Sequence, residues 1–149
     1  MNRTTPQMRS IAKHLLIFET ERNSTSEADV AMTFPVAEQL RPHLAMLVGE
    51  RGVRALLARA LSLATAEAPW LSEVRVDAQG ELDGLGALRS RLDPAEFHEG
   101  KVVLLAQLLG LLVAFVGPSL TSRLVGEIWP EVPLRRRNFG KEIKREKDK

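Results

Sequence analysis

The chain has 149 residues, of which 44% are hydrophobic, 27% are charged and 5% are aromatic, and it contains no cysteine. These values are typical of one globular domain that is long enough to bury a core, and they argue against a disordered chain. The absence of cysteine excludes disulfides, thiol nucleophiles and cysteine metal sites, and it is typical of proteins from a reducing compartment.

The net charge of +2 is unevenly distributed along the chain. Residues 131–149 carry eight basic and four acidic side chains, a net charge of +4, whereas residues 1–130 carry 13 basic and 15 acidic side chains, a net charge of −2. A slightly acidic body is not typical of a domain that binds nucleic acid over a whole face. We therefore expect a single helical domain over 1–130 and a basic, flexible C-terminal tail over 131–149.

Apolar residues at helical spacing predict three helices in the first half of the chain. They cover about residues 8–22, roughly 36–48 and 53–67, with a tight turn between Gly49 and Gly52 that separates the second helix from the third. Pro42 predicts that the second helix begins late or bends at that position. The residues expected to be buried are Met8, Ile11, Leu15 and Phe18 in the first helix, Val36, Leu40, Leu44 and Leu47 in the second, and Val53, Leu57, Ala60, Leu61 and Ala64 in the third.

The apolar pattern changes to a period of two near residues 73–83, which predicts one small β-hairpin there. Val74 and Val76 alternate with polar residues, and Leu82 begins the return strand. Gly80 is expected to supply the positive φ at the turn. Two strands alone are marginally stable in water, so the hairpin must lie against the helices.

Asp93 and Pro94 predict a helix start, with Asp93 as the N-cap and Pro94 at the first helical position. The helix then enters the apolar run VVLLAQLLGLLVAFVG, residues 102–117, which Pro118 ends. Sixteen helical residues extend about 24 Å at roughly 1.5 Å per residue, less than the ~30 Å core of a bilayer. We therefore expect this run to be the central helix of a soluble protein rather than an integral membrane span.

Small residues stand at intervals of four along this central helix, at Ala106, Gly110 and Ala114. They form a candidate helix-packing groove, because small side chains allow another helix to approach closely. A helix that is apolar on every side needs neighbours on every side. The other helices of one monomer or a second copy of the chain can supply them, and we expect a homodimer. A bulky ridge beside the groove consists of Leu104, Leu108, Leu111 and Phe115.

A last helix is predicted over 119–129, with Ser119 as its N-cap. Beyond it, the tail places Arg135, Arg136 and Arg137 side by side, with Lys141 close behind. Guanidinium and ammonium groups bind phosphates, so these four residues are the candidate contacts for nucleic acid or an anionic membrane surface. The alternative is a terminus that only increases solubility.

No pattern of catalytic or metal-ligating residues is recognisable in the sequence. His14, His43 and His98 fall on different predicted elements and form no HxxxH or HExxH pattern. The stretch DAQGELDG at 77–84 has leucine where a calcium loop needs glycine, and GERG at 49–52 lacks the Gly-Lys-Ser/Thr ending of a phosphate loop. We therefore expect no enzymatic activity, no metal and no cofactor.

Three segments carry a resemblance to known proteins: RALLARALSLATAEAPWL (54–71), VRVDAQGELDGL (74–85) and VVLLAQLLGLLVAFVGPSLTSRLVGEIWP (102–130). Together they cover about half of the chain and resemble a family of small, mostly helical bacterial proteins of unassigned function. The resemblance implies a bacterial protein of the cytoplasm, and it implies no activity and no functional residue.

The sequence as a whole predicts an all-α fold, a bundle of five to six helices with one small hairpin. Its expected function is that of a small helical protein-interaction or regulatory module that is not an enzyme and that associates with itself or with a protein partner. Binding of nucleic acid, or of an anionic membrane surface, through the tail is the alternative.

Overall fold

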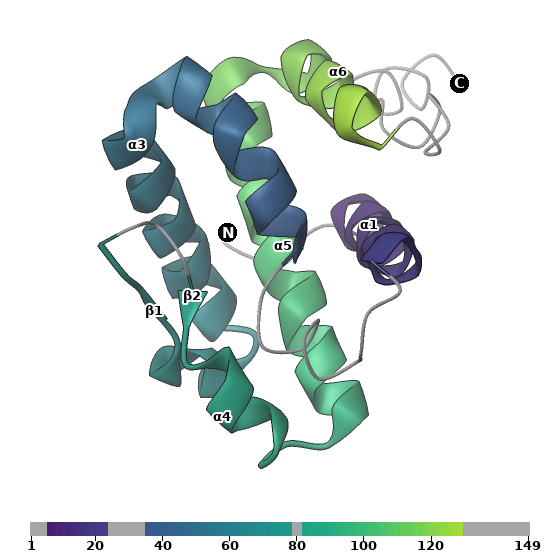
Figure 1. Cartoon of the computed structure of the whole chain (residues 1–149), viewed down its shortest axis with the longest axis vertical. Coiled ribbons are helices and arrows are strands. Elements are labelled where there is room, and N and C mark those ends of the chain that lie inside the picture. Colours follow the sequence, from purple (N-terminus) through teal and green to yellow (C-terminus); the bar gives the residue numbers. More distant parts are fainter. Residues whose placement is uncertain (1–5, 24–34, 79–81, 130–149) are drawn as a thin grey trace.

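The computed structural model describes residues 6–23, 35–78 and 82–129, and the statements below concern these residues (Figure 1). They form five α-helices, one short 3-10 helix and a two-stranded antiparallel sheet, which confirms the predicted all-α fold with one small hairpin. In chain order the elements are α1 (Pro6–Asn23), α3 (Pro35–Thr65), η1 (Pro69–Glu73), β1 (Arg75–Val76), β2 (Leu82–Asp83), α4 (Leu85–Arg89), α5 (Pro94–Val116) and α6 (Pro118–Ile128).

Two arms joined at Gly49 make up the long helix α3 (Figure 1). Gly49 has φ 78° and ψ 167°, a combination that is essentially restricted to glycine. The two predicted helices are therefore present, but a kink at one residue replaces the expected turn between them. The helix begins at Pro35, upstream of Pro42, so a late start at Pro42 is wrong, and the alternative, a bend at Pro42, stays a prediction.

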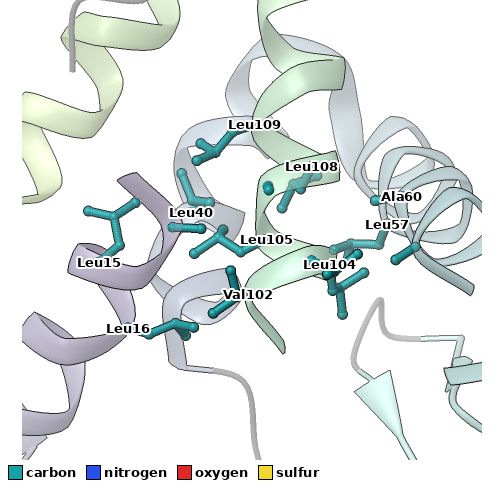
Figure 2. Close-up of a cluster of buried hydrophobic side chains, with 14 of the residues drawn as sticks. Leu15, Leu16, Leu40, Leu57, Ala60, Val102, Leu104, Leu105, Leu108 and Leu109 are labelled. Carbon is teal, nitrogen blue, oxygen red and sulfur yellow. The ribbon is translucent and has the colours of Figure 1, made fainter. Parts of the chain in front are cut away.

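The middle of α5 is the centre of the core, with every residue of Val102–Leu109 buried. The helices α1 and α3 both pack against it, and α6 packs against its C-terminal part (Figure 1). Figure 2 shows Leu105 on the side of α1 and the first arm of α3, and Leu104 on the side of the second arm. Each buried leucine contributes roughly 1.5–3 kcal/mol to stability. The predicted apolar stripe of the second arm is confirmed, since Val53, Leu57, Ala60, Leu61 and Ala64 are all buried.

Local signals place both ends of α5. The carboxylate of Asp93 accepts a hydrogen bond from the backbone N–H of Ala95 at 3.1 Å, which confirms the predicted N-cap. Gly117, at φ 95°, ends α5 and is also the N-cap of α6. The prediction of Ser119 as N-cap is therefore wrong, because α6 begins one residue earlier, at Pro118.

The hairpin and the preceding η1 lie beside α3, and Trp70 of η1 also packs against α5. The strands pair Arg75 with Asp83 and Val76 with Leu82, and β1 packs against α3. The predicted positive φ of Gly80 lies outside the described residues.

By length and composition alone, α5 is the helix of the described ranges that could cross a membrane. Within the structure, 61% of its most apolar 18-residue window is buried. Central helices of soluble proteins share both properties, so this observation does not assign the helix to a membrane. Its role as the core helix of a soluble protein stays a prediction.

Candidate functional site

Large apolar side chains are exposed where α3 kinks and where α5 ends. Met46 is 89% exposed, Leu47 44% and Phe115 65%, and the neighbouring Ala114 is exposed as well. Figure 1 shows the kink of α3 and the passage from α5 to α6 at the same end of the molecule. We call these four residues the apolar end face. Large apolar side chains that are exposed at one end of a molecule are candidates for an interaction surface.

Two residues of the end face correct the sequence-based expectations. Leu47 belongs to the predicted buried stripe of its helix, and Phe115 belongs to the predicted ridge of α5, yet both are exposed. The reason for Phe115 is that Leu112 is the last buried residue of α5, so the final turn of the helix extends beyond the core. Leu47 lies two residues before the kink at Gly49, where the arm ends.

The predicted helix-packing groove runs from the core to the end face. Ala106 is buried, Gly110 is half-buried and Ala114 is exposed. A Cβ atom added at Gly110 would meet no atom within 4 Å in the described part of the chain. Close packing of another helix along this groove therefore stays a prediction. The outer half of the groove, from Gly110 to Ala114, adjoins Phe115.

A polar network joins α1, α5 and the residues that follow α3. The guanidinium of Arg9 pairs with the carboxylate Oε1 of Glu67, and it donates to Oε2 of Glu99 at 3.1 Å. The side-chain amide of Gln107 donates to the other carboxylate oxygen of Glu67, Oε2, at 3.0 Å. The Glu67 side chain is only 10% exposed, so this network satisfies a buried charge and accounts for the burial of Gln107. This polar network can stabilise the packing of α1 against the core.

Two lysines, Lys13 of α1 and Lys101 of α5, act electrostatically on His98 of α5; we call these three residues the basic group. Burial lowers the pKa of His98 below its ordinary value of 6.5, and the ammonium groups of Lys101 and Lys13 lower it further, against the opposing carboxylate of Glu99. Burial also lowers the pKa of Lys101 below 10.5. The Lys101 ammonium lies 5.2 Å from the centre of the Phe97 ring.

The remaining predicted site residues are not placed by the structure. Arg135, Arg136, Arg137 and Lys141 lie outside the described residues. Within the ranges 6–23, 35–78 and 82–129, no group of three or more His, Cys, Asp or Glu side chains is arranged to hold a metal ion.

Sequence reasoning missed Met46 and the members of the polar network and the basic group. The exposure of Met46 could have been predicted, because Met46 is apolar but lies outside the helical stripe that contains Leu40 and Leu44. The contact of Lys101 with Phe97 could also have been predicted, since the two residues are one helical turn apart. The partners Arg9 and Glu67 give no local signal.

Comparison of the chain with protein-family models, with curated proteins and with solved structures gives no match. The resemblance to a family of small helical bacterial proteins therefore stays a prediction that rests on the three quoted segments.

Proposed function

We propose that this protein is a non-enzymatic protein-interaction module that self-associates through its apolar end face. The observation that carries the proposal is the joint exposure of Met46, Leu47 and Phe115 at one end of the molecule. Removal of such side chains from water favours association, since the hydrophobic effect is proportional to the apolar area that is buried. The composition and the family resemblance favour a bacterial cytoplasmic protein.

The charges beside the end face favour a second copy of the chain as the occupant. Glu50 and Arg51 are both exposed and directly follow the kink residue Gly49. In a twofold-symmetric dimer each surface meets itself, so a patch that carries both signs of charge can be complementary to its own copy. Glu50 of each copy can then face Arg51 of the other.

The size of the end face indicates a weak association. A stable interface buries about 800 Å² on each partner, more than a few side chains provide. Burial of one large apolar side chain contributes roughly 1.5–3 kcal/mol, and part of this gain is offset by the entropy lost on association. We therefore expect a dissociation constant in the micromolar range.

Sedimentation-velocity ultracentrifugation over a range of micromolar concentrations tests the proposal. We expect the wild-type protein to shift from monomer to dimer as the concentration rises, and we expect Met46→Ser and Phe115→Ser to stay monomeric. The matched control is Ile17→Ser, because Ile17 is also a large apolar residue, 50% exposed, but lies on α1 outside the end face. This variant should dimerise like the wild type.

Two results would contradict self-association through this surface. One is a wild-type protein that remains monomeric throughout the concentration range. The other is an equal loss of dimer in the Ile17 variant and the end-face variants. Binding of nucleic acid that weakens steeply with salt and depends on Arg135, Arg136 and Arg137 would instead favour the alternative function of the tail.

A further inference from the structure

Met46 is the most exposed large apolar side chain of the described residues, at 89%. It lies on the first arm of α3, three residues before the kink at Gly49, and belongs to the apolar end face. Met8, the other methionine that the structure describes, is half-buried on α1 and packs against the core. A chemical change at the Met46 sulfur can therefore alter the end face without disturbing the core, whereas a change at Met8 affects the core.

All sulfur atoms of this protein are thioethers, since the chain has four methionines and no cysteine. Hydrogen peroxide converts a thioether to a sulfoxide. The sulfur attacks one peroxide oxygen, an S–O bond forms as the O–O bond breaks, and the other oxygen leaves as water. The methionine loses two electrons and the peroxide gains them. No thiol of the chain competes for the oxidant, so the accessible thioether of Met46 is a preferred target.

We propose that oxidation of Met46 to the sulfoxide by hydrogen peroxide is a reversible modification that weakens self-association through the end face; this inference rests on the function proposed above. The sulfoxide oxygen is polar and accepts hydrogen bonds, unlike the thioether. The other three residues of the end face, Leu47, Ala114 and Phe115, have hydrocarbon side chains and no donor for it. Burial of a polar group without a partner opposes association, and a twofold-symmetric dimer contains two such groups.

The modification can be reversed by methionine sulfoxide reductases, which act on the two sulfoxide epimers. The sulfoxide oxygen leaves as water, the thioether is restored, and a dithiol reductant is oxidised to a disulfide. Because the chain has no cysteine, neither the peroxide nor the dithiol can form or break a disulfide in this protein. A reversible change in its oligomeric state under these reagents therefore reports on methionine.

Limited oxidation of the full-length protein tests the proposal. Dilute, monomeric protein is treated with hydrogen peroxide, catalase stops the reaction, and peptide mass spectrometry gives the sulfoxide content at each methionine. We expect Met46 to be converted before Met8. In sedimentation velocity the dissociation constant of the oxidised dimer should rise about tenfold or more, and treatment with both reductases should restore it. The free energy of unfolding of the monomer in urea should stay unchanged, because Met46 lies outside the core.

Variants and fractionation assign the effect to one sulfur atom. Met8→Leu removes the half-buried thioether, and its dimer should respond to peroxide as the wild type does. Met46→Leu is compared only with itself before and after peroxide, and its dissociation constant should not change. In partly oxidised wild-type protein, size-exclusion chromatography should concentrate the Met46 sulfoxide in the later, monomer-rich fractions.

Three results would overturn the proposal: an unchanged dissociation constant after full conversion of Met46, a dimer of Met46→Leu that peroxide weakens as much as that of the wild type, or oxidation of Met8 before Met46. Failure of the proposed function is distinguished from these results because it is observed before any peroxide is added. An untreated wild-type protein that stays monomeric contradicts self-association, and this inference with it.

Discussion

The ring of Trp70 lies directly against Gly100 of α5. A Cβ atom at this position would lie 2.0 Å from Cζ2 of Trp70, whose ring stacks on Phe97 with 5.6 Å between the ring centres. We expect Gly100→Ala to lower the free energy of unfolding by about 1–3 kcal/mol, because the Trp70 ring, which also stacks on Phe97, must move. Urea denaturation measures this loss.

Gly110→Ala is the matched control on the same helix. A Cβ atom at Gly110 meets nothing within 4 Å in the described structure. Only the higher helix propensity of alanine should therefore change the free energy of unfolding. We expect this variant to gain about 0.5–1 kcal/mol. Equal effects of the two substitutions would show that Trp70 does not pack on Gly100.

Burial decides how much each ion pair contributes to stability. Arg9→Met removes a positive partner from Glu67, whose side chain is 10% exposed, and we expect a loss of about 1–3 kcal/mol in urea denaturation. The control is Arg91→Met, which breaks a 2.7 Å pair with Glu73 whose side chains are both more than half exposed. Its expected effect is below about 1 kcal/mol. A larger loss in the Arg91 variant than in the Arg9 variant would refute the role of Glu67 as an anchor of α1.

At the scale of elements, the kink of α3 depends on Gly49. Its positive φ and extended ψ strain any residue with a Cβ atom, although the space around it is open. We expect Gly49→Ala to cost about 1–3 kcal/mol of unfolding free energy. Alanine could avoid this strain only by a change in the path of the two arms of α3, and such a change would also move Leu47 in the end face. Ala55→Ser, an exposed change in the second arm, is the control and should alter stability little. A fully stable Gly49→Ala protein would show that the kink does not require glycine.

Elements specified by local signals could be predicted from the sequence. The Asp93 cap and the Pro94 start depend on neighbouring residues, and the stripe from Val53 to Ala64 depends on helical periodicity. Periodicity shows which side of a helix is apolar, but it does not show where its neighbours end. For this reason Leu47 and Phe115 were expected to be buried and are exposed.

The contacts that build the candidate sites join distant parts of the sequence. Arg9 and Glu67 are 58 residues apart, and Glu67 and Gln107 are 40 apart. The electrostatic effect of Lys13 on His98 likewise depends on the packing of α1 against α5. No local pattern specifies such pairs, because a charged residue on the polar face of a helix can face either solvent or a partner that is distant in sequence. The packing groove could be predicted from the spacing of small residues, but the open space beside Gly110 is known only from the three-dimensional arrangement.

At the scale of the whole molecule, the helices α1, α3 and α6 all pack against the core helix α5. Unfolding of α5 therefore requires most of the fold to open. We expect the backbone amides of Val102–Leu109 to exchange hydrogen most slowly in native-state exchange measured by NMR. Their exchange free energies should equal the global unfolding free energy obtained with urea. The last turn, residues 113–116, should exchange faster, since Leu112 is the last buried residue of α5. Faster exchange at Val102–Leu109 than in the second arm of α3 would mean that α5 opens before the rest of the core and that another element holds the fold together.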